Sequence, residues 1–502
     1  MLTIYETDTG SVLTVMNSNG FMTVSPSDIE FMYPGVRTSW TVSEMSGCSP
    51  GDLIVEEGGL AVGYISSDGR TWRLPQETVD AERAVVVANR MLASPFRTDG
   101  NFVRLFTDVL PGMSKGFTAP AESSYYEKLI PVGWCGPFLD AGGYANMNRE
   151  LVLRLPRFGI LPVTDIYPTL DQVDLRTQTV LKMMSSLKPK ASSYQKVFAL
   201  TPMPHSKHGG KSVFFTMMET STLHPDFVRY CNVYSDEVWA PSSANAELFR
   251  RGGVRKPIRV VPLGVDEDIY SIPPSPLDLS AAKTLYGRPV SDGICSFKYL
   301  TVIQWNFRKG YDALIKAFCS AFGAGDDVCL VIATQYSADL VKSTLDAYVP
   351  RNTDLPQVVL YNDIIPINSM PSLYDACNAY VHLSRGEGFS LTQIEAAARG
   401  LPVVTCLHSG MTEYIREDNS FPVYCPDTEP CPPPLASVSY FYQGQKSWRL
   451  GQEQVEQAAA RMCEILHGRE CASKKASVLQ KEVFSSYTWK SVVARVVELL
   501  AG

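Results

Sequence analysis

The sequence predicts an α/β protein made of two domains with parallel sheets, preceded by a small, mostly β module. Three observations lead to this prediction. The chain has 502 residues, which exceeds the size of one ordinary hydrophobic core. From about Val85, helix-like stretches alternate with short β-branched runs, a pattern typical of parallel β-α-β units. A segment rich in proline and small polar residues at 271–292 interrupts this pattern and indicates a linker.

The first 85 residues differ from the rest in pattern and in charge. Short apolar runs such as LTIYET and LIVEEGG are separated by turn signals such as SNG and SDG, which favours antiparallel strands. Residues 1–80 hold three arginines against eleven Asp and Glu residues, whereas the rest is close to neutral. We expect a β module at 1–85, an N-terminal α/β domain at 86–270 and a C-terminal α/β domain at 292–480. The last helix, at about 485–502, is expected to join the N-terminal domain.

Composition narrows the class of protein. With 45% hydrophobic and 19% charged residues, the chain should form globular domains. A net charge of −7 without a basic region disfavours stable binding to nucleic acid. The first residues, MLTIYETDTG, lack signal-peptide features, and no apolar run reaches the length of a membrane span. We therefore expect a cytoplasmic protein with no transmembrane segment.

Cysteine and histidine spacing does not predict a metal site. Twelve cysteines are spread singly, without CxxC pairs, so we expect neither a zinc cluster nor a disulfide framework. No spacing of His, Asp and Glu resembles a zinc or calcium site. Cys425 and Cys431 flank a Pro-rich loop, which leaves a pairing between them open.

The most informative segment is YVHLSRGEGFSLTQIEAAARGLPVVTC, at 380–406. An apolar strand is followed by a glycine-containing loop, a short helix and a second buried strand. Ser390 and Gln393 have the spacing of a capping box, and Gly400 followed by Pro402 ends the helix. Such a unit presents loop amides and a helix N-terminus at the carboxyl edge of the sheet, where an anionic diphosphate is favoured.

Two carboxylates belong to this segment. Glu387 lies in the loop and Glu395 on the helix, with seven residues between them. Carboxylates accept hydrogen bonds from vicinal hydroxyls, so one can face a sugar and the other a ribose. For an isolated pair, two solvated surface acids would be the simpler interpretation. The surrounding residues favour the functional interpretation.

Those residues resemble the motif E-G-F-G-x-x-x-x-E-A-x-A-x-G-x-P-V-V of the retaining GT-B glycosyltransferases often called group 1. This chain has EGFS from Glu387, EAAA from Glu395 and GLPVV from Gly400, with Ser390 in place of the usual glycine. The resemblance implies two Rossmann-like domains that face a cleft. It also implies that Glu387 contacts the donor sugar and Glu395 the nucleotide ribose. The other residues that the motif places at the donor are Gly388, Phe389 and Ser390.

A second resemblance is LTVIQWNFRKGYDALIKAF, at 300–318. It is similar to the strand, loop and helix that carry an Arg-Lys-Gly triplet in the same family. Arg308 and Lys309 would hold the donor diphosphate and stabilise it as leaving group, as cations do in place of a metal. The resemblance therefore implies no divalent ion and no cofactor besides a nucleoside diphosphate sugar. It also implies same-face transfer to an acceptor hydroxyl, with a donor phosphate oxygen taking the proton.

Further donor contacts are expected from two loops. IPVGWCGPFLDAGGYANMNREL, at 130–151, resembles the family's glycine-rich loop, so Gly142 and Gly143 are expected to let the backbone approach the donor. The loop after VVLYND, around Asp363 and Ile364, is expected to meet the base.

Three residues are candidates on the acceptor side. The landmarks from Phe215 to Tyr270 follow the family in order and include Glu219, which is either a buried acid at a helix start or an acceptor contact. His205 and His208 follow the apolar strand KVFAL on a loop that should open into the cleft. We expect His205 to take part in catalysis and His208 to lie near the acceptor; the alternative for either is an exposed loop residue.

Two other functions share these features. A GT-B sugar epimerase or phosphorylase has the same fold, and an inactive sugar-nucleotide-binding or scaffold protein would keep the donor site. The two glutamates together with Arg-Lys-Gly favour transfer. The donor's base and sugar stay open, as does the acceptor, which can be a glycan, lipid, protein or modified nucleobase.

Overall fold

The structure is a computed structural model. It describes residues 53–57, 60–65, 71–73, 130–167, 172–173, 175–186, 194–206, 208–351 and 354–501. The chain divides into two compact units, Met1–Lys196 and Val197–Gly502. This division differs from the domain boundaries expected at 86, 271–292 and 480, which remain predictions. None of the helices in the described ranges is long and apolar enough to cross a membrane.

The first unit begins with a small antiparallel sheet in the order β1-β2-β3. Its strands are β1 (Leu53–Glu57), β2 (Leu60–Ile65) and β3 (Thr71–Arg73). This sheet falls within the segment where the sequence predicts antiparallel strands. The rest of the expected β module lies outside the described residues.

The same unit continues with a parallel pair of strands, β4 and β5, in register from Ile130 with Ile160 to Pro137 with Tyr167. Trp134 of β4 is fully buried, and its indole N–H donates to Asn148 on the following helix at 3.0 Å. The elements are β4 (Ile130–Pro137), α4 (Gly143–Val152), η3 (Leu155–Phe158), β5 (Ile160–Tyr167) and α5 (Leu175–Ser186).

The second unit opens with three neighbouring parallel strands, β7-β8-β9. All residues of β7 and β8 are buried, as expected of strands covered on both faces. Ser242 caps α7 by accepting from the Asn245 amide, and Gly253 ends the helix at φ 100°. The elements are β6 (Lys196–Phe198), which begins at the unit boundary, β7 (Ser212–Phe215), α6 (Pro225–Tyr234), β8 (Glu237–Ala240), α7 (Ser243–Gly252), β9 (Ile258–Val260) and α8 (Glu267–Tyr270).

A seven-stranded sheet forms the centre of the rest of this unit, in the order β10-β13-β12-β11-β14-β15-β16. Neighbouring strands are parallel except for β10 and β13. The strands are β10 (Lys283–Tyr286), β11 (Phe297–Val302), β12 (Val328–Ala333), β13 (Gln357–Tyr361), β14 (Ala379–His382), β15 (Val403–Leu407) and β16 (Phe421–Tyr424).

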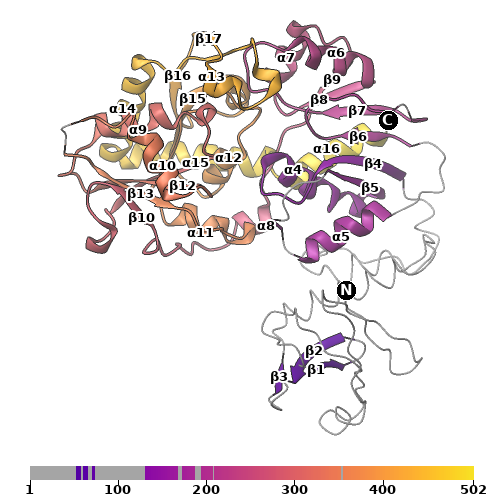
Figure 1. Ribbon diagram of the computed structural model, residues 1–502, viewed down its shortest axis with the longest axis horizontal. Helices are drawn as coiled ribbons and strands as arrows, with labels where there is room; N and C mark the ends of the chain where they lie inside the picture. The colour runs from indigo at the N-terminus through magenta and orange to yellow at the C-terminus, as the bar shows by residue number, and fades with distance from the viewer. Residues whose placement is uncertain are drawn as a thin grey trace. The chain divides into compact units, whose positions relative to one another are not determined.

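Helices surround this sheet in Figure 1, where α9 packs on α14 and α12 packs on α15. They are α9 (Tyr311–Ala321), α10 (Ala338–Leu345), α11 (Met370–Asp375), α12 (Leu391–Ala398), α13 (Pro433–Ala436), α14 (Gln452–His467) and α15 (Arg469–Ser486). The last helix, α16 (Trp489–Ala501), follows α15 and is not one of the helices around this sheet. Shorter pieces are η4 (Val290–Asp292), η5 (Phe307–Lys309), η6 (Ile367–Ser369), η7 (Ser409–Glu413), β17 (Thr428–Pro430), η8 (Tyr440–Tyr442) and β18 (Lys446–Trp448). Thr488, just before α16, forms an isolated parallel bridge with Val265.

The strand order of this sheet reverses between β11 and β14. From β11 the chain moves through β12 to β13 on one side, and β14, β15 and β16 follow on the other side. In open α/β sheets, ligands bind at the carboxyl ends of the two strands that flank such a reversal. A ligand is therefore expected to bind at the loops that follow β11 and β14.

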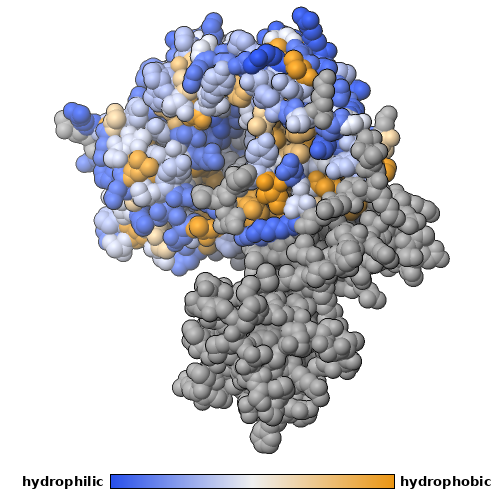
Figure 2. All heavy atoms as spheres, turned by 45° about the vertical axis from the view of Figure 1, so that its right-hand side comes forward, coloured by the Kyte–Doolittle hydropathy of each residue, from blue (hydrophilic) through white to orange (hydrophobic). Residues whose placement is uncertain are grey.

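Hydrophilic residues cover most of the described surface on the face drawn in Figure 2, and apolar residues occur in small groups. The most exposed large apolar side chain of the described residues is Ile364, at 72% of its full exposure. Cys425 and Cys431 are free thiols.

Candidate active site

The loops after β11 and β14 converge at the strand reversal. The first loop carries Arg308 and Lys309 in η5, and the second carries Glu387. Lys309 Nζ lies 2.7 Å and Arg308 Nη1 3.1 Å from the same oxygen of Glu387, Oε1. Arg308 also donates to the Gly386 carbonyl at 2.6 Å. The structure therefore brings together the two cations and the loop carboxylate that the sequence places in separate segments.

His382, the last residue of β14, completes the contacts of this carboxylate. Its Nε2 lies 3.1 Å from Glu387 Oε1, and its side chain is fully buried. Its other ring nitrogen, Nδ1, has no hydrogen-bond partner in the described part of the chain. Sequence reasoning missed this residue, although a histidine at the end of the apolar strand AYVH, directly before the loop, is a detectable signal.

The electrostatics keep the carboxylate charged and the imidazole neutral. Burial opposes ionisation of Glu387, but Lys309 and Arg308 outweigh it and hold the pKa of this carboxyl well below its usual value. Burial lowers the pKa of His382 even though the adjacent Glu387 favours the protonated ring. Burial likewise lowers the pKa of Lys309, against the effect of Glu387. The adjacent Glu387 carboxylate therefore stabilises the charged form of this buried lysine.

Arg308 retains capacity for a further anion. Its Nε is buried and has no hydrogen-bond partner among the described residues. The Nε of the neighbouring loop cation, Arg385, also has no hydrogen-bond partner among these residues, but its Nη1 and Nη2 form a two-point pair with Asp312, both contacts at 2.8 Å. Its guanidinium also lies 3.8 Å from the centre of the Phe307 ring. Arg385 therefore supports the loop, whereas Arg308 faces its polar centre.

Glu219 belongs to the same cluster. Its carboxylate lies 3.9 Å from Arg308 Nη2 and accepts a hydrogen bond from the Tyr442 hydroxyl at 2.7 Å. Gly386 permits this approach, because a Cβ at Gly386 would lie 1.7 Å from the backbone oxygen of Glu219. Glu219 is thus a half-buried acid next to Arg308 that lies before α6 and not at its start, and its contact with an acceptor remains a prediction.

Helix α12 begins differently from the expected capping box, and that prediction is wrong. Ser390 is the N-cap, but it has φ 76° and makes no side-chain cap. Its hydroxyl is buried without a partner among the described residues. Gln393 donates instead to the Thr405 hydroxyl at 2.8 Å. The left-handed backbone, which suits the family's glycine, turns the serine hydroxyl away from the helix amides.

Two other motif residues, Glu395 on α12 and Phe389 in the loop before it, differ in burial and in contacts. Glu395 is half-buried and accepts from the Tyr374 hydroxyl at 2.7 Å. The Phe389 ring is buried between Tyr414 and Tyr487, with ring centres 5.3 and 5.6 Å away. Phe389 is therefore a core residue whose side chain anchors the loop, so a donor contact would fall to its backbone.

The Glu387 backbone is held from the end of β15. Ser409 donates to the Glu387 carbonyl at 2.8 Å and accepts from the Glu387 amide at 3.1 Å. The Gly410 amide donates to the same carbonyl at 2.9 Å. A Cβ at Gly410 would lie 2.0 Å from the Gly388 carbonyl oxygen, so a glycine is required here. Sequence reasoning did not assign a role to Ser409.

The two candidate histidines make local contacts. His205 lies between two backbone oxygens, with Nδ1 2.9 Å from that of Ser206 and Nε2 2.7 Å from that of Tyr234. His208 Nε2 lies 2.8 Å from the Ser212 hydroxyl. The catalytic role of His205 and the acceptor role of His208 remain predictions.

The remaining donor candidates lie on other loops. Asp363 and Ile364 are exposed at the carboxyl end of β13. Gly142 and Gly143 belong to the first unit, where Gly142 caps α4 and donates to Asp140 at 2.6 Å. A Cβ at Gly143 would meet nothing within 4 Å. Their contacts with a donor remain predictions.

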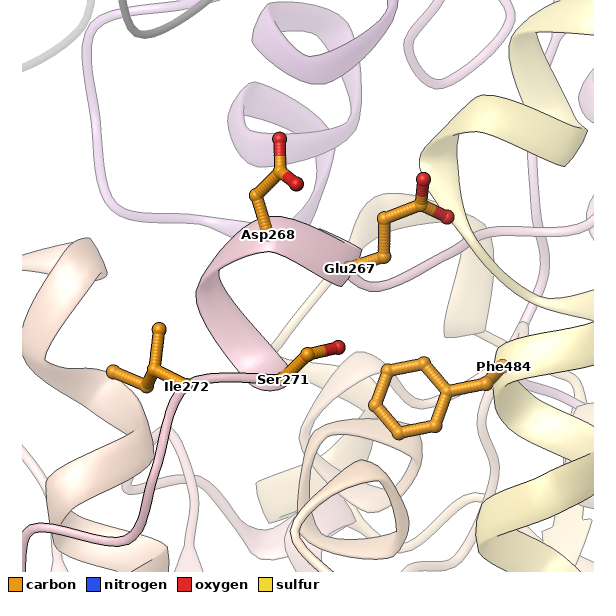
Figure 3. Close-up of a pocket in the computed structure, with 5 residues that line it drawn as sticks. All are labelled: Glu267, Asp268, Ser271, Ile272 and Phe484. Carbon is orange, nitrogen blue, oxygen red and sulfur yellow. The ribbon is translucent and has the colours of Figure 1, made fainter. Parts of the chain in front are cut away.

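A pocket of the second unit has a different character. Figure 3 shows its lining residues, which come from α8, the residues after it, and α15. They are Glu267, Asp268, Ser271, Ile272 and Phe484. Two of them are carboxylates and none is a cation, which suits an anionic diphosphate poorly. This pocket contains none of the predicted donor residues.

Comparison with protein families finds a match over the segment that contains Arg308, Lys309 and Glu387. Residues 298–430, from β11 to β17, match the family described as Glycosyl transferases group 1. No curated protein matches the chain in sequence.

Solved structures match over most of the chain. HepE of Anabaena, in complex with UDP and glucose, is 15% identical over 74% of this chain and 99% of its own, with a TM-score of 0.52. Sucrose-phosphate synthase of Thermosynechococcus elongatus is 13% identical over 74% of this chain and 98% of its own, with a TM-score of 0.50. WaaG, a glycosyltransferase involved in lipopolysaccharide biosynthesis, is 15% identical over 74% and 100%, with a TM-score of 0.50. At these identities the likeness concerns the fold.

The fold is that of the GT-B glycosyltransferases, and the domain that carries Glu387, Arg308 and Lys309 is that of group 1. The group 1 match covers residues 298–430, the segment that contains both motifs on which the resemblance to this family rests.

Proposed function

We propose that this chain is a retaining glycosyltransferase that moves a hexosyl group from a nucleoside diphosphate sugar to an acceptor hydroxyl without a metal ion. The observation that carries the proposal is the pair of buried cations, Arg308 and Lys309, on one carboxylate at the strand reversal. A structural neighbour, HepE, binds UDP and glucose, which supports a donor of this class. The proposal includes a cytoplasmic setting, as expected from the sequence.

The chemistry follows from the charges at the cluster. When the bond between the sugar and the diphosphate breaks, negative charge grows on the leaving phosphate oxygen. Glu387 holds Arg308 Nη1 and the Lys309 ammonium in fixed positions, so little reorganisation would be needed as the charge develops on a diphosphate bound beside them. Two cations supply the stabilisation that a divalent ion would otherwise supply.

Retention requires that the acceptor hydroxyl enters on the face from which the diphosphate leaves. In the proposed mechanism a donor phosphate oxygen takes the acceptor proton, so no protein base is needed. Glu387 then orients the sugar through its hydroxyl groups, and Glu395 holds the ribose. The neutral His382 ring fixes the Glu387 carboxylate and is a positioning residue in this scheme.

The proposal is tested by turnover. UDP, GDP, ADP and dTDP sugars are incubated with the full chain without added magnesium or manganese, and the release of nucleoside diphosphate is followed with and without candidate acceptors. We expect one donor to be consumed, and the anomeric configuration of the product, read by NMR, to match that of the donor.

A matched pair of variants locates the activity. Lys309→Ala should reduce turnover at least about tenfold, since a hydrogen bond to a charged group contributes about 1.5–3 kcal/mol. Lys316→Ala, which removes an exposed lysine from the next helix, should leave turnover unchanged. Donor binding without any turnover would favour an inactive binding or scaffold protein. An epimerised sugar or release by inorganic phosphate would favour the epimerase or phosphorylase.

A further inference from the structure

Three buried side chains that can bind a metal lie together on the last two strands of the seven-stranded sheet. They are Cys406 on β15, His408 just after it, and Cys425 just after β16. One ligand atom from each lies within 4.8 Å of the other two. Their exposed fractions are 0%, 4% and 5%, so they form a cluster in the protein interior.

The backbone register explains why the three side chains converge. β15 and β16 are parallel, with Cys406 opposite Val423 and Leu407 opposite Tyr424. Continuing this register places His408 opposite Cys425. Alternate residues of a strand point to the same face, so Cys406, His408 and Cys425 share one face of the sheet. The cluster is therefore built into the sheet and does not depend on mobile surface side chains.

The surroundings suit the imidazole for binding a metal. His408 Nε2 lies 2.9 Å from the Ser384 carbonyl oxygen, and Nδ1 lies 3.4 Å from the Ser409 hydroxyl. Whichever nitrogen binds an ion, the other has a partner that fixes the ring, as is usual for metal-bound histidines. The Trp448 ring stacks on His408 with centres 4.5 Å apart and planes at 6°, which also restrains the ring.

We propose that Cys406, His408 and Cys425 bind a zinc ion. Two thiolates and one imidazole are ligands that zinc prefers, and the two thiolate charges neutralise the charge of the ion in a buried site. Three protein ligands leave the fourth tetrahedral position for water or another small ligand. The spacing of these two cysteines and the histidine does not match a CxxC motif. The sequence alone therefore did not predict this site.

The ion would act on the active-site loop without contacting the donor. It would fix His408 directly after β15, and the residue after His408, Ser409, holds the Glu387 backbone. This role is structural and independent of the proposed transfer reaction, in which Arg308 and Lys309 replace a metal at the diphosphate. A chelator that removes zinc should therefore loosen the loop, whereas magnesium or calcium should have no effect.

The experiment measures zinc in the full chain, purified under reducing conditions without a chelator. We expect stoichiometric zinc by elemental analysis and, after cobalt exchange, a near-ultraviolet charge-transfer band that reports thiolate ligands. Cys425→Ala should weaken zinc affinity more than about tenfold in a competition titration with a coloured chelator. Cys329→Ala, which removes a buried cysteine from β12, is the matched control and should keep the zinc.

Metal analysis of the wild-type protein tests the zinc proposal even if a variant of the cluster does not fold. Folded wild type without bound zinc, and without a cobalt band when cobalt is supplied, would overturn the proposal. Equal loss of zinc in the Cys329→Ala control would overturn it too, because the ion would then not depend on the cluster. A disulfide between Cys406 and Cys425, found by peptide mapping after thiol trapping, would also overturn the proposal. It would show that the two cysteines form a redox pair and not a metal site.

Discussion

Ser390 offers a sensitive test of how the active-site loop is built. It has φ 76°, in the left-handed region that costs a non-glycine residue about 1 kcal/mol or more. Its hydroxyl is also buried without a partner among the described residues, which costs about 1 kcal/mol or more. Glycine removes both costs but adds about 0.4–1 kcal/mol of freedom to the unfolded chain. We therefore expect Ser390→Gly to stabilise the protein by about 1 kcal/mol.

The chain provides a matched control at the other non-glycine residue of the described part with positive φ, Ser409, at 46°. Its hydroxyl makes two hydrogen bonds with the Glu387 backbone, so Ser409→Gly relieves strain but loses these bonds. We expect this variant to lose about 1 kcal/mol or more. Denaturant unfolding followed by tryptophan fluorescence measures both changes. A destabilised Ser390→Gly, or the same sign for both variants, would refute the reasoning.

Further predictions concern the charged cluster and its glycine. Glu387→Gln leaves the buried Lys309 without its carboxylate, so unfolding free energy at neutral pH should fall by about 3 kcal/mol, measured by denaturant titration. Because the folded-state pKa of Glu387 lies below its unfolded value of 4.5, its stabilisation is present above about pH 4.5 and is lost as pH falls further. Thermal melting between pH 3 and 6 should therefore show a weaker acid dependence in Glu387→Gln, and equal slopes would contradict this. Gly386→Ala drives a Cβ against the Glu219 backbone and should destabilise the protein, whereas Gly325→Ala, in open space, should be nearly neutral in the same melting assay.

The strand-loop-helix units around the site could be predicted from the sequence. Residues 300–318 form the end of β11, η5 and α9, and residues 380–406 form β14, α12 and most of β15. These patterns are local, because the apolar runs and the glycines that end the helices lie within about twenty residues of one another. The sheet order then places the two loops side by side, which the resemblance to a known family anticipated.

Other features of the site depend on contacts between distant segments. Glu219 and Tyr442 are separated by 223 residues, and no spacing rule connects them. Ser390 has the residue type of a helix cap, but the surrounding loop imposes a left-handed backbone, so the local rule fails. Cys406 and Cys425 meet through strand register, which the sequence does not show until the strands are paired.

The central claim is that Arg308 and Lys309 hold the donor diphosphate. Calorimetric titration of UDP and GDP into wild type, Arg308→Ala and the control Arg461→Ala, which removes a cation from α14, tests it most directly. We predict that one nucleotide binds wild type and Arg461→Ala equally, and that Arg308→Ala binds it about tenfold to hundredfold more weakly. Equal affinity in Arg308→Ala and wild type would contradict the account, because the diphosphate would then lie elsewhere.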